Sequence, residues 1–426
     1  MSTLSSSLDT REKLNVQSRS MPKPSLGMLY AISVPLAAGF VHLCEFRVGG
    51  LMVSGYVWML MLAIGLLIFL LDNALTSRRR ISFPWIAWMP FASFVWLSLV
   101  WGKVDRETIQ AACQITMPIF VGVIVSVFVR SEEQLVLLLR AFRWSLVFLA
   151  AGFVVSYARV RGDLDGVGFR MGSLTCILIG ANYLTSSSKS RVVAWSGWLT
   201  CLAMAGVCGA RMATLAILVM PILRPEVGKF WAKLAAVLAM LALGVGIFHT
   251  PHFQERFFHG GEGGSLQDVF YGKLNTSGRF EAWPLIWDKA LEHPLIGAGI
   301  GASGPYSDVV SNLGGHPHND YLRVFFDLGS VGSVFFFLVI IWQSASLLLL
   351  IRLSEGPVKH AFEAAWLGWI MFLFTSCTDN TLVYCAAYMN PLFALIGAGY
   401  SIFRQQRHVR RTTTASLLSA TGGDAR

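Results

Sequence analysis

A run containing two histidines carries the side chains best suited to acid–base chemistry. His316 and His318 flank Pro317 and are followed by Asn319. Histidine changes charge near neutral pH, so either ring could act as a general base toward a hydroxyl group. A His-x-His pair could also form half of a metal site, but the sequence supplies no complete ligand set at metal-site spacing. Further donors would have to come from Asp320, His252 and His259. We favour a base and predict no metal and no cofactor.

Two isolated arginines are candidates for binding an anion. Arg211 opens a short apolar segment after the tight turn at Gly209. An ionisable residue against a membrane span is costly and is therefore a functional candidate. The alternative is a side chain that merely extends to the lipid headgroups.

Arg279 lies near the start of a predicted amphipathic helix. The helix is indicated by apolar residues at spacings of three and four, with Ser277 or Gly278 as its cap. These residues are Phe280, Trp283, Trp287 and Leu291. We expect this apolar face to lie on the membrane surface or on the rest of the protein. A cation does not stabilise a helix start, so an anionic ligand held by two hydrogen bonds explains Arg279 better. An arginine in a solvated loop is the alternative.

A glycine-rich run follows this helix at residues 294–301 and superficially resembles a phosphate-binding loop. No strand precedes it and no βαβ unit surrounds it, so a dinucleotide site is not favoured. We interpret the run as a flexible turn.

The elements that must position these residues are membrane helices. The chain has 426 residues, of which 54% are hydrophobic and only 14% are charged, against about 25% charged in soluble domains. Its long apolar runs favour helices over an alternating barrel pattern. We predict an all-α polytopic integral membrane protein with about twelve transmembrane helices. The predicted spans are 26–43, 51–71, 82–102, 108–129, 135–157, 168–186, 192–208, 210–223, 229–248, 330–351, 361–377 and 389–404. The seventh and eighth could instead be one broken helix.

The net charge of +10 is explained by topology without nucleic acid. Lys and Arg gather in alternate connections and in both terminal segments, which places those connections in the cytoplasm by the positive-inside rule. Both termini are then cytoplasmic, and one large periplasmic loop lies between the ninth and tenth spans. The predicted parts are a cytoplasmic tail (1–25), nine spans (26–248), the loop (249–329), three spans (330–404) and a basic, disordered tail (405–426).

The polar residues occur in an order that resembles the O-antigen ligase and polymerase superfamily. His318-Asn319 is followed after nine residues by Gly329 and then by Gly332, as in the family signature. The earlier segment with Ser277-Gly278-Arg279, Trp283 and residues 294–299 resembles the family's loop, and Arg211 occupies the place of its arginine at a span boundary. The resemblance covers about residues 200–400.

The resemblance implies a metal-independent transferase of the bacterial inner membrane with a periplasmic site. Its members move a glycan from undecaprenyl pyrophosphate to the lipid A-core of lipopolysaccharide, or to another lipid-linked repeat unit in polymerases that make O-antigen or exopolysaccharide. By this resemblance Arg211 and Arg279 would hold the pyrophosphate and His318 would activate the acceptor hydroxyl. His316 and Asn319 would assist in binding substrate, although His316 could also share the role of base. We favour the ligase over the polymerase. A transporter or flippase would show paired halves and helices interrupted at mid-membrane, and a scaffold would leave the polar residues unexplained.

Overall fold

The structure is a computed structural model. It describes residues 25–44, 47–48, 51–75, 81–160, 169–186, 191–207, 209–225, 230–258, 265, 267, 275–311 and 315–421. The predicted N-terminal tail, apart from Ser25, and His259 lie outside the described residues.

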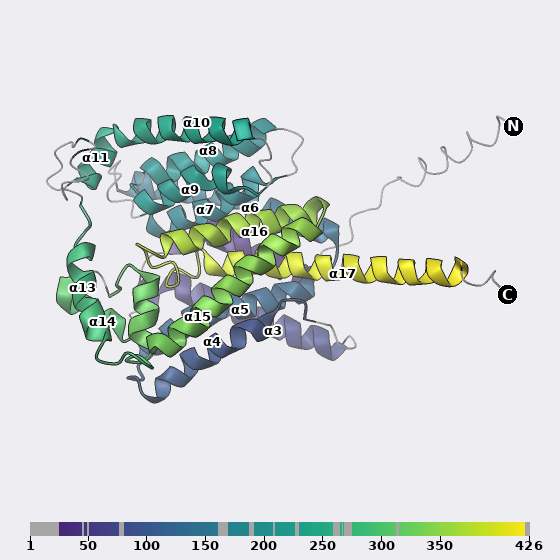
Figure 1. Ribbon diagram of the computed structural model, residues 1–426, viewed down its shortest axis with the longest axis horizontal. Coiled ribbons are helices and arrows are strands. Elements are labelled where there is room, and N and C mark those ends of the chain that lie inside the picture. Colours follow the sequence, from purple (N-terminus) through teal and green to yellow (C-terminus); the bar gives the residue numbers. More distant parts are fainter. Residues whose placement is uncertain are drawn as a thin grey trace.

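The chain is almost entirely helical (Figure 1). Its first part forms α2 (Leu26–Phe40), α3 (Val53–Leu75), α4 (Trp85–Leu97), α5 (Arg106–Phe128), α6 (Glu132–Arg159), α7 (Arg170–Leu184), α8 (Arg191–Val207), α9 (Arg211–Leu223) and α10 (Phe230–Phe248). The remainder forms α11 (Pro251–Phe257), α13 (Arg279–Ala290), α14 (Ser303–Ser311), α15 (Asp320–Leu353), α16 (Gly356–Thr375) and α17 (Met389–Thr421). Two 3₁₀ turns, η1 (Val41–Cys44) and η2 (Ser98–Val100), extend α2 and α4. The short strands β1 (Arg47–Val48) and β2 (Leu51–Met52) pair antiparallel.

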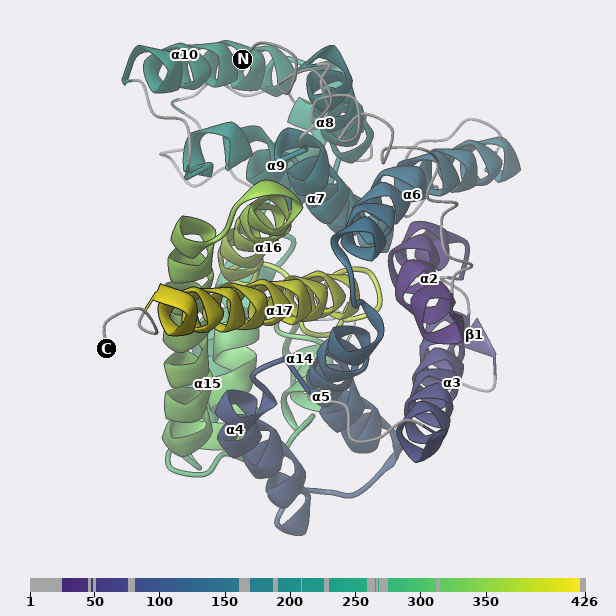
Figure 2. The same cartoon turned by 90° about the vertical axis from the view of Figure 1, so that its right-hand side faces the viewer.

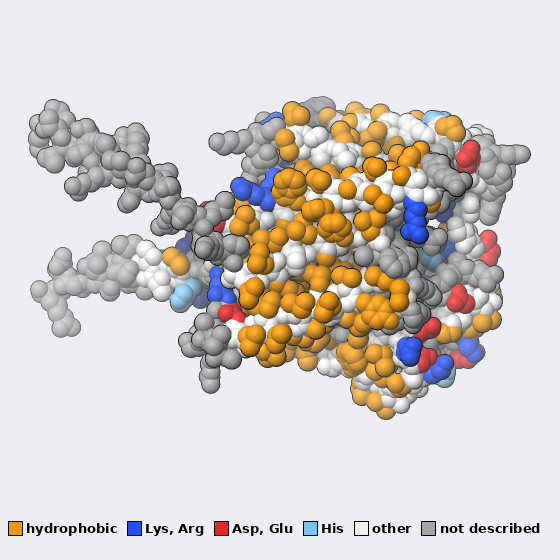
Figure 3. Space-filling view, turned by 180° about the vertical axis from the view of Figure 1, so that it is seen from behind, with side chains coloured by type: hydrophobic (Ala, Val, Ile, Leu, Met, Phe, Trp, Pro, Cys, Tyr) orange, Lys and Arg blue, Asp and Glu red, His pale blue; other side chains and the backbone are white. Residues whose placement is uncertain are grey.

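The described residues of each of the twelve predicted apolar ranges lie mainly in a helix, while the count of twelve membrane spans stays a prediction. Among the described residues, four helices are long and apolar enough to cross a membrane, namely Val53–Asp72, Arg106–Phe128, Glu132–Arg159 and Asp320–Leu353, and six shorter apolar helices accompany them. Hydrophobic side chains cover the middle of the face shown in Figure 3, whereas most charged side chains lie toward its two ends. The chain is therefore a multi-pass membrane protein. The predicted seventh and eighth spans are separate helices, α8 and α9, which pack against each other.

Helix α17 lies at the centre of the bundle (Figure 2), packed against α5 and α16. Gly397 of α17 faces Gly122 of α5, where an added Cβ would overlap the opposing backbone. Small residues let helix backbones approach closely in membranes, where packing drives association. The predicted disordered tail is instead helical as far as Thr421. Residues 404–421 contain no Gly or Pro and begin with Arg and Gln, which favour helix.

The bundle has two ends that differ in the connections they contain. At one end, the start of α13 contacts the α16–α17 connection and the segment before it contacts the start of α9, while α14 packs against α13 (Figure 1). At the other end, contacts join Arg130 to Asp72, Arg224 to Glu363, and Arg404 to the carbonyl of Ile81. The residues that meet at each end are the ones that the predicted order of spans places on one side of the membrane. Which end faces the periplasm stays a prediction.

Gly329 breaks α15 into a short first segment and a long second one. Its φ of 64° is left-handed, and an added Cβ would overlap the backbone of Leu295. The glycine-rich run holds the break, because Ser330 and Val331 donate their N–H groups to the carbonyls of Pro294 and Leu295 at 2.8 and 3.0 Å. The run predicted to be a flexible turn is thus a hydrogen-bonded support for the segment that follows His318.

Candidate active site

His318 lies at the end of the bundle where three connections meet. The backbone of His318 has a left-handed φ of 52°, and Asn319 directly after it is the N-cap of α15. The Asn319 side chain accepts a hydrogen bond from the N–H of Leu322 at 3.0 Å. Asn319 therefore caps the helix that follows it. His316 is partly buried in the same turn.

A buried carboxylate fixes the start of α15 to the α16–α17 connection. Asp320 accepts hydrogen bonds from the Ser376 hydroxyl at 2.9 Å and from the Leu382 N–H at 3.0 Å. The Asp320 N–H also donates to the Ser376 carbonyl at 2.8 Å. Because Asp320 is fully buried, these bonds are the compensation that a desolvated carboxylate requires. These contacts give Asp320 a structural role at the start of α15.

The α16–α17 connection supplies the partners of the His318 ring. The Nδ1 atom lies 3.0 Å from the Asn380 side-chain amide and 3.6 Å from Asp379 Oδ1. Only 12% of the His318 side chain is exposed, against 30% for Asp379. The ring is therefore held in place by groups on one edge, as a side chain that transfers protons requires.

The pKa of Asp379 lies below its ordinary value. Burial acts to raise this pKa, but the adjacent His318 ring, the hydrogen bond from the Asn380 N–H and the nearby Arg279 together outweigh it. Asp379 is thus ionised at neutral pH and can stabilise a positive charge on His318.

Arg279 is brought to the same connection. It is the first residue of α13, after Gly278 at a φ of 75°, and its Nη1 donates to the Thr378 carbonyl at 2.7 Å. Of the two residues predicted to cap this helix, Ser277 and Gly278, the structure places Gly278 at the cap position. Gly278 has no side chain, so the cap makes no side-chain hydrogen bond. The guanidinium is consequently next to the residue that precedes Asp379.

Arg211 lies at the first residue of α9, as predicted, and reaches the segment that precedes α13. Its guanidinium donates to the Asn275 carbonyl and, at 3.3 Å, to the Ser277 hydroxyl. Ser277 is two residues before Arg279, so the two arginines converge although 68 positions separate them in the sequence. The structure therefore brings Arg211, Arg279 and His318 to one end of the bundle.

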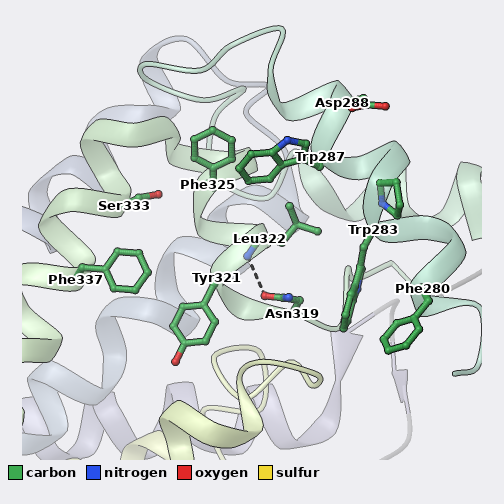
Figure 4. A pocket seen from close by; sticks show the side chains of 11 residues that line it. Phe280, Trp283, Trp287, Asp288, Asn319, Tyr321, Leu322, Phe325, Ser333 and Phe337 are labelled. Atoms are coloured by element: carbon green, nitrogen blue, oxygen red, sulfur yellow. Dashed lines mark hydrogen bonds between the residues drawn. The ribbon is translucent and has the colours of Figure 1, made fainter. Parts of the chain in front are cut away.

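An apolar cavity of about 850 Å³ adjoins this cluster between α13 and α15 (Figure 4). Its walls are largely aromatic, with Asn319 as a polar member. The residues that line it include Phe280, Trp283, Trp287, Tyr321, Phe325 and Phe337. Trp287 stacks on Phe325 with 4.9 Å between ring centroids. The cavity is open and large enough for part of an apolar chain.

Among the large apolar residues predicted for one face of α13, Trp283 packs against the contact between α13 and α15. Ala282, Ile286 and Ala290 pack against Leu322 and Phe326 of α15. Phe280, Trp287 and Leu291 are about half exposed. The small residues allow α13 to lie close to α15, and Phe280 and Trp287 from the other stripe are left to form a wall of the cavity.

Asp379 and Asn380 are the site residues that the sequence prediction missed. They lie about 60 positions after His318, with no motif to connect them to it. The sequence did contain one signal that could have indicated them. Two adjacent polar residues lie between the predicted spans 361–377 and 389–404, in a connection on the same predicted side of the membrane as His318. Within the described part of the chain, no group of three or more His, Cys, Asp and Glu side chains is placed to hold a metal ion.

Comparison with known proteins identifies the region that carries this geometry. Residues 175–337 match the family model described as O-antigen ligase. The match includes Arg211, α13, His318 and the break at Gly329, whereas Asp379 and Asn380 lie after it. No curated protein matches the chain. The resemblance to the O-antigen ligase and polymerase superfamily is thereby confirmed over residues 175–337.

Proposed function

We propose that this protein is an O-antigen ligase that transfers a glycan from undecaprenyl pyrophosphate to a hydroxyl group of lipid A-core at the periplasmic face of the inner membrane. The single observation that carries the proposal is the His318–Asp379 pair beside Arg279, next to an apolar cavity lined by the residues that follow His318 and Arg279 in the chain. Transfer from a lipid-linked donor needs an apolar cavity for the lipid chain, cations for the pyrophosphate and a base for the acceptor hydroxyl. The cavity, the two arginines and His318 would meet these needs in one place.

In the proposed reaction, the acceptor oxygen forms a bond to the anomeric carbon of the first sugar. The bond from that carbon to the pyrophosphate oxygen breaks, and the electron pair leaves with the pyrophosphate. The Asn380 NH2 group 3.0 Å from Nδ1 can only donate, so the working form requires that amide to turn its oxygen, which is buried without a hydrogen bond, toward a proton on Nδ1. With Nδ1 protonated beside Asp379, Nε2 of His318 takes the acceptor proton. Asp379 stabilises the imidazolium that results.

Arg211 and Arg279 would stabilise the charge that develops on the departing pyrophosphate. Both are fixed by backbone carbonyls, so little reorganisation is needed when the charge appears. Guanidinium groups bind phosphate through two parallel hydrogen bonds, which a point charge cannot reproduce. We therefore also propose that the reaction proceeds without a metal ion.

The apolar cavity would receive the first isoprene units of the donor. Asn319 lies at its polar side and Phe280 directly follows Arg279. A chain seated there would leave its pyrophosphate near the two arginines. The exposed aromatic rings are suited to this contact because they bury a large area of apolar surface.

The test is transfer by the purified protein in detergent, with an undecaprenyl-pyrophosphate-linked glycan as donor. Product should form on added lipid A-core, it should survive EDTA, and His318→Ala should reduce it about 10²- to 10⁴-fold. Product that grows only by joining donor units would establish the polymerase instead. Loss on chelation with recovery on a divalent ion would overturn metal independence. Normal transfer by His318→Ala at normal abundance would refute the site.

A further inference from the structure

Trp283 connects the apolar cavity to the backbone that carries His318. Its indole N–H donates to the carbonyl of Pro317 at 2.8 Å. Its ring lines the cavity and lies 5.4 Å from the ring of Phe280, measured between centroids (Figure 4). One side chain thus touches both the proposed lipid seat and the residue before the proposed base.

The backbone at His318 needs support of this kind. A left-handed φ costs a residue other than glycine about 1 kcal/mol or more, and persists where the surroundings hold it. The Asn319 cap holds the turn from one side. The hydrogen bond from Trp283 holds it from the other side, through the carbonyl of Pro317.

Helix α13 makes a second connection to the same site. Arg279, one turn before Trp283, donates to the Thr378 carbonyl next to Asp379. The first two turns of α13 therefore contact the chain before His318 and the chain that supplies its carboxylate. A shift of α13 would alter the position of the ring relative to its partners.

We propose that Trp283 is a positioning residue that couples occupation of the α13–α15 cavity to the placement of His318. A chain in the cavity presses on the Trp283 ring and stabilises the position in which its N–H meets Pro317. The base is then held in its working position when a donor is bound. This inference rests on the proposed function, since it requires a lipid-linked donor.

The test compares Trp283→Phe with Trp287→Phe, two substitutions of the same kind in one cavity. Trp283→Phe keeps an aromatic ring but removes the hydrogen bond, so kcat should fall roughly three- to tenfold with little change in donor KM. Trp287 lines another part of the cavity, where it stacks on Phe325. Trp287→Phe should therefore weaken donor binding and raise the donor KM, with kcat nearly unchanged. Membrane abundance and thermal stability in detergent are measured for both.

A donor with a short farnesyl chain supplies the decisive comparison. In the wild type, kcat should be lower with the farnesyl donor than with the undecaprenyl donor. In Trp283→Phe this dependence on chain length should be lost, because the two changes interrupt the same coupling. An equal dependence in both proteins, or a Trp283→Phe variant with normal kcat, would overturn the inference. If the wild type transfers from neither donor, the proposed function itself fails.

Discussion

Replacing Asp379 by asparagine isolates the electrostatic part of the proposed mechanism. The substitution preserves the size of the side chain but removes the negative charge 3.6 Å from Nδ1 of His318. Coulomb's law at that distance gives about 1 kcal/mol in bulk water and about 5 kcal/mol at an effective dielectric constant of about 20. Because 30% of the Asp379 side chain is exposed, we expect about 2 kcal/mol, which corresponds to a kcat lowered about 30-fold.

The assay is glycan transfer by purified Asp379→Asn, with membrane abundance measured in parallel. Glu107→Gln is a matched control, because it removes an exposed carboxylate from the first turn of α5, and its rate should equal that of the wild type. The double variant with His318→Ala should be no slower than His318→Ala alone, since Asp379 acts through the ring. Full activity of Asp379→Asn, or a further loss in the double variant, would refute the reasoning.

The lowered pKa of Asp379 also predicts how stability depends on pH. A carboxyl whose pKa is lower in the folded state adds stability above its unfolded pKa, and that stability is lost as the pH falls through the folded value. The wild type should therefore unfold at a higher temperature than Asp379→Asn at pH 6. The difference should disappear only in acid below the ordinary aspartate pKa of about 4. A difference that already disappears between pH 5 and 6 would contradict the assigned charge.

Three further predictions concern the cations, the break in α15 and the topology. Arg279→Ala and Arg211→Ala should abolish transfer, and the lysine variants should recover only part of it, because an ammonium group cannot replace the bidentate contact; full recovery by lysine would argue against that contact. Gly329→Ala should lower the unfolding temperature in detergent, since a left-handed φ costs about 1–3 kcal/mol and the new Cβ would meet the backbone of Leu295; unchanged stability would show that the break relaxes. A cysteine at Ser265 should react with an impermeant thiol reagent in spheroplasts and one at Ser187 should not, and the reverse pattern would invert the topology.

The helices could be predicted from the sequence because long apolar runs leave few alternatives in a membrane. The separation of α8 from α9 remained open until the structure showed two packed helices. The break at Gly329 was visible only as a glycine in a family signature. Its conformation depends on a run more than 30 positions earlier, and spacing along one segment contains no such information.

The candidate site was predicted in part, for a similar reason. His318 and Arg279 were found because their residue types and positions relative to helix starts are unusual locally. Asp379 and Asn380 matter through a contact with His318 that only the folded chain makes. The sequence left open whether the large apolar residues of α13 lie on the membrane surface or on the rest of the protein, because large apolar residues suit both places. The structure shows that alanines form part of the contact with α15 and that most of the large residues stay half exposed.

The alanines of α13 determine how wide the cavity can be. Ala282 and Ala290 face α15 on either side of Ile286, so the volume of two side chains fixes the spacing between the two helices. A leucine at either position would move α13 outward and enlarge the space between Trp287 and Phe325. The width of the proposed binding cavity could thus be changed by exchanging residues that do not line it.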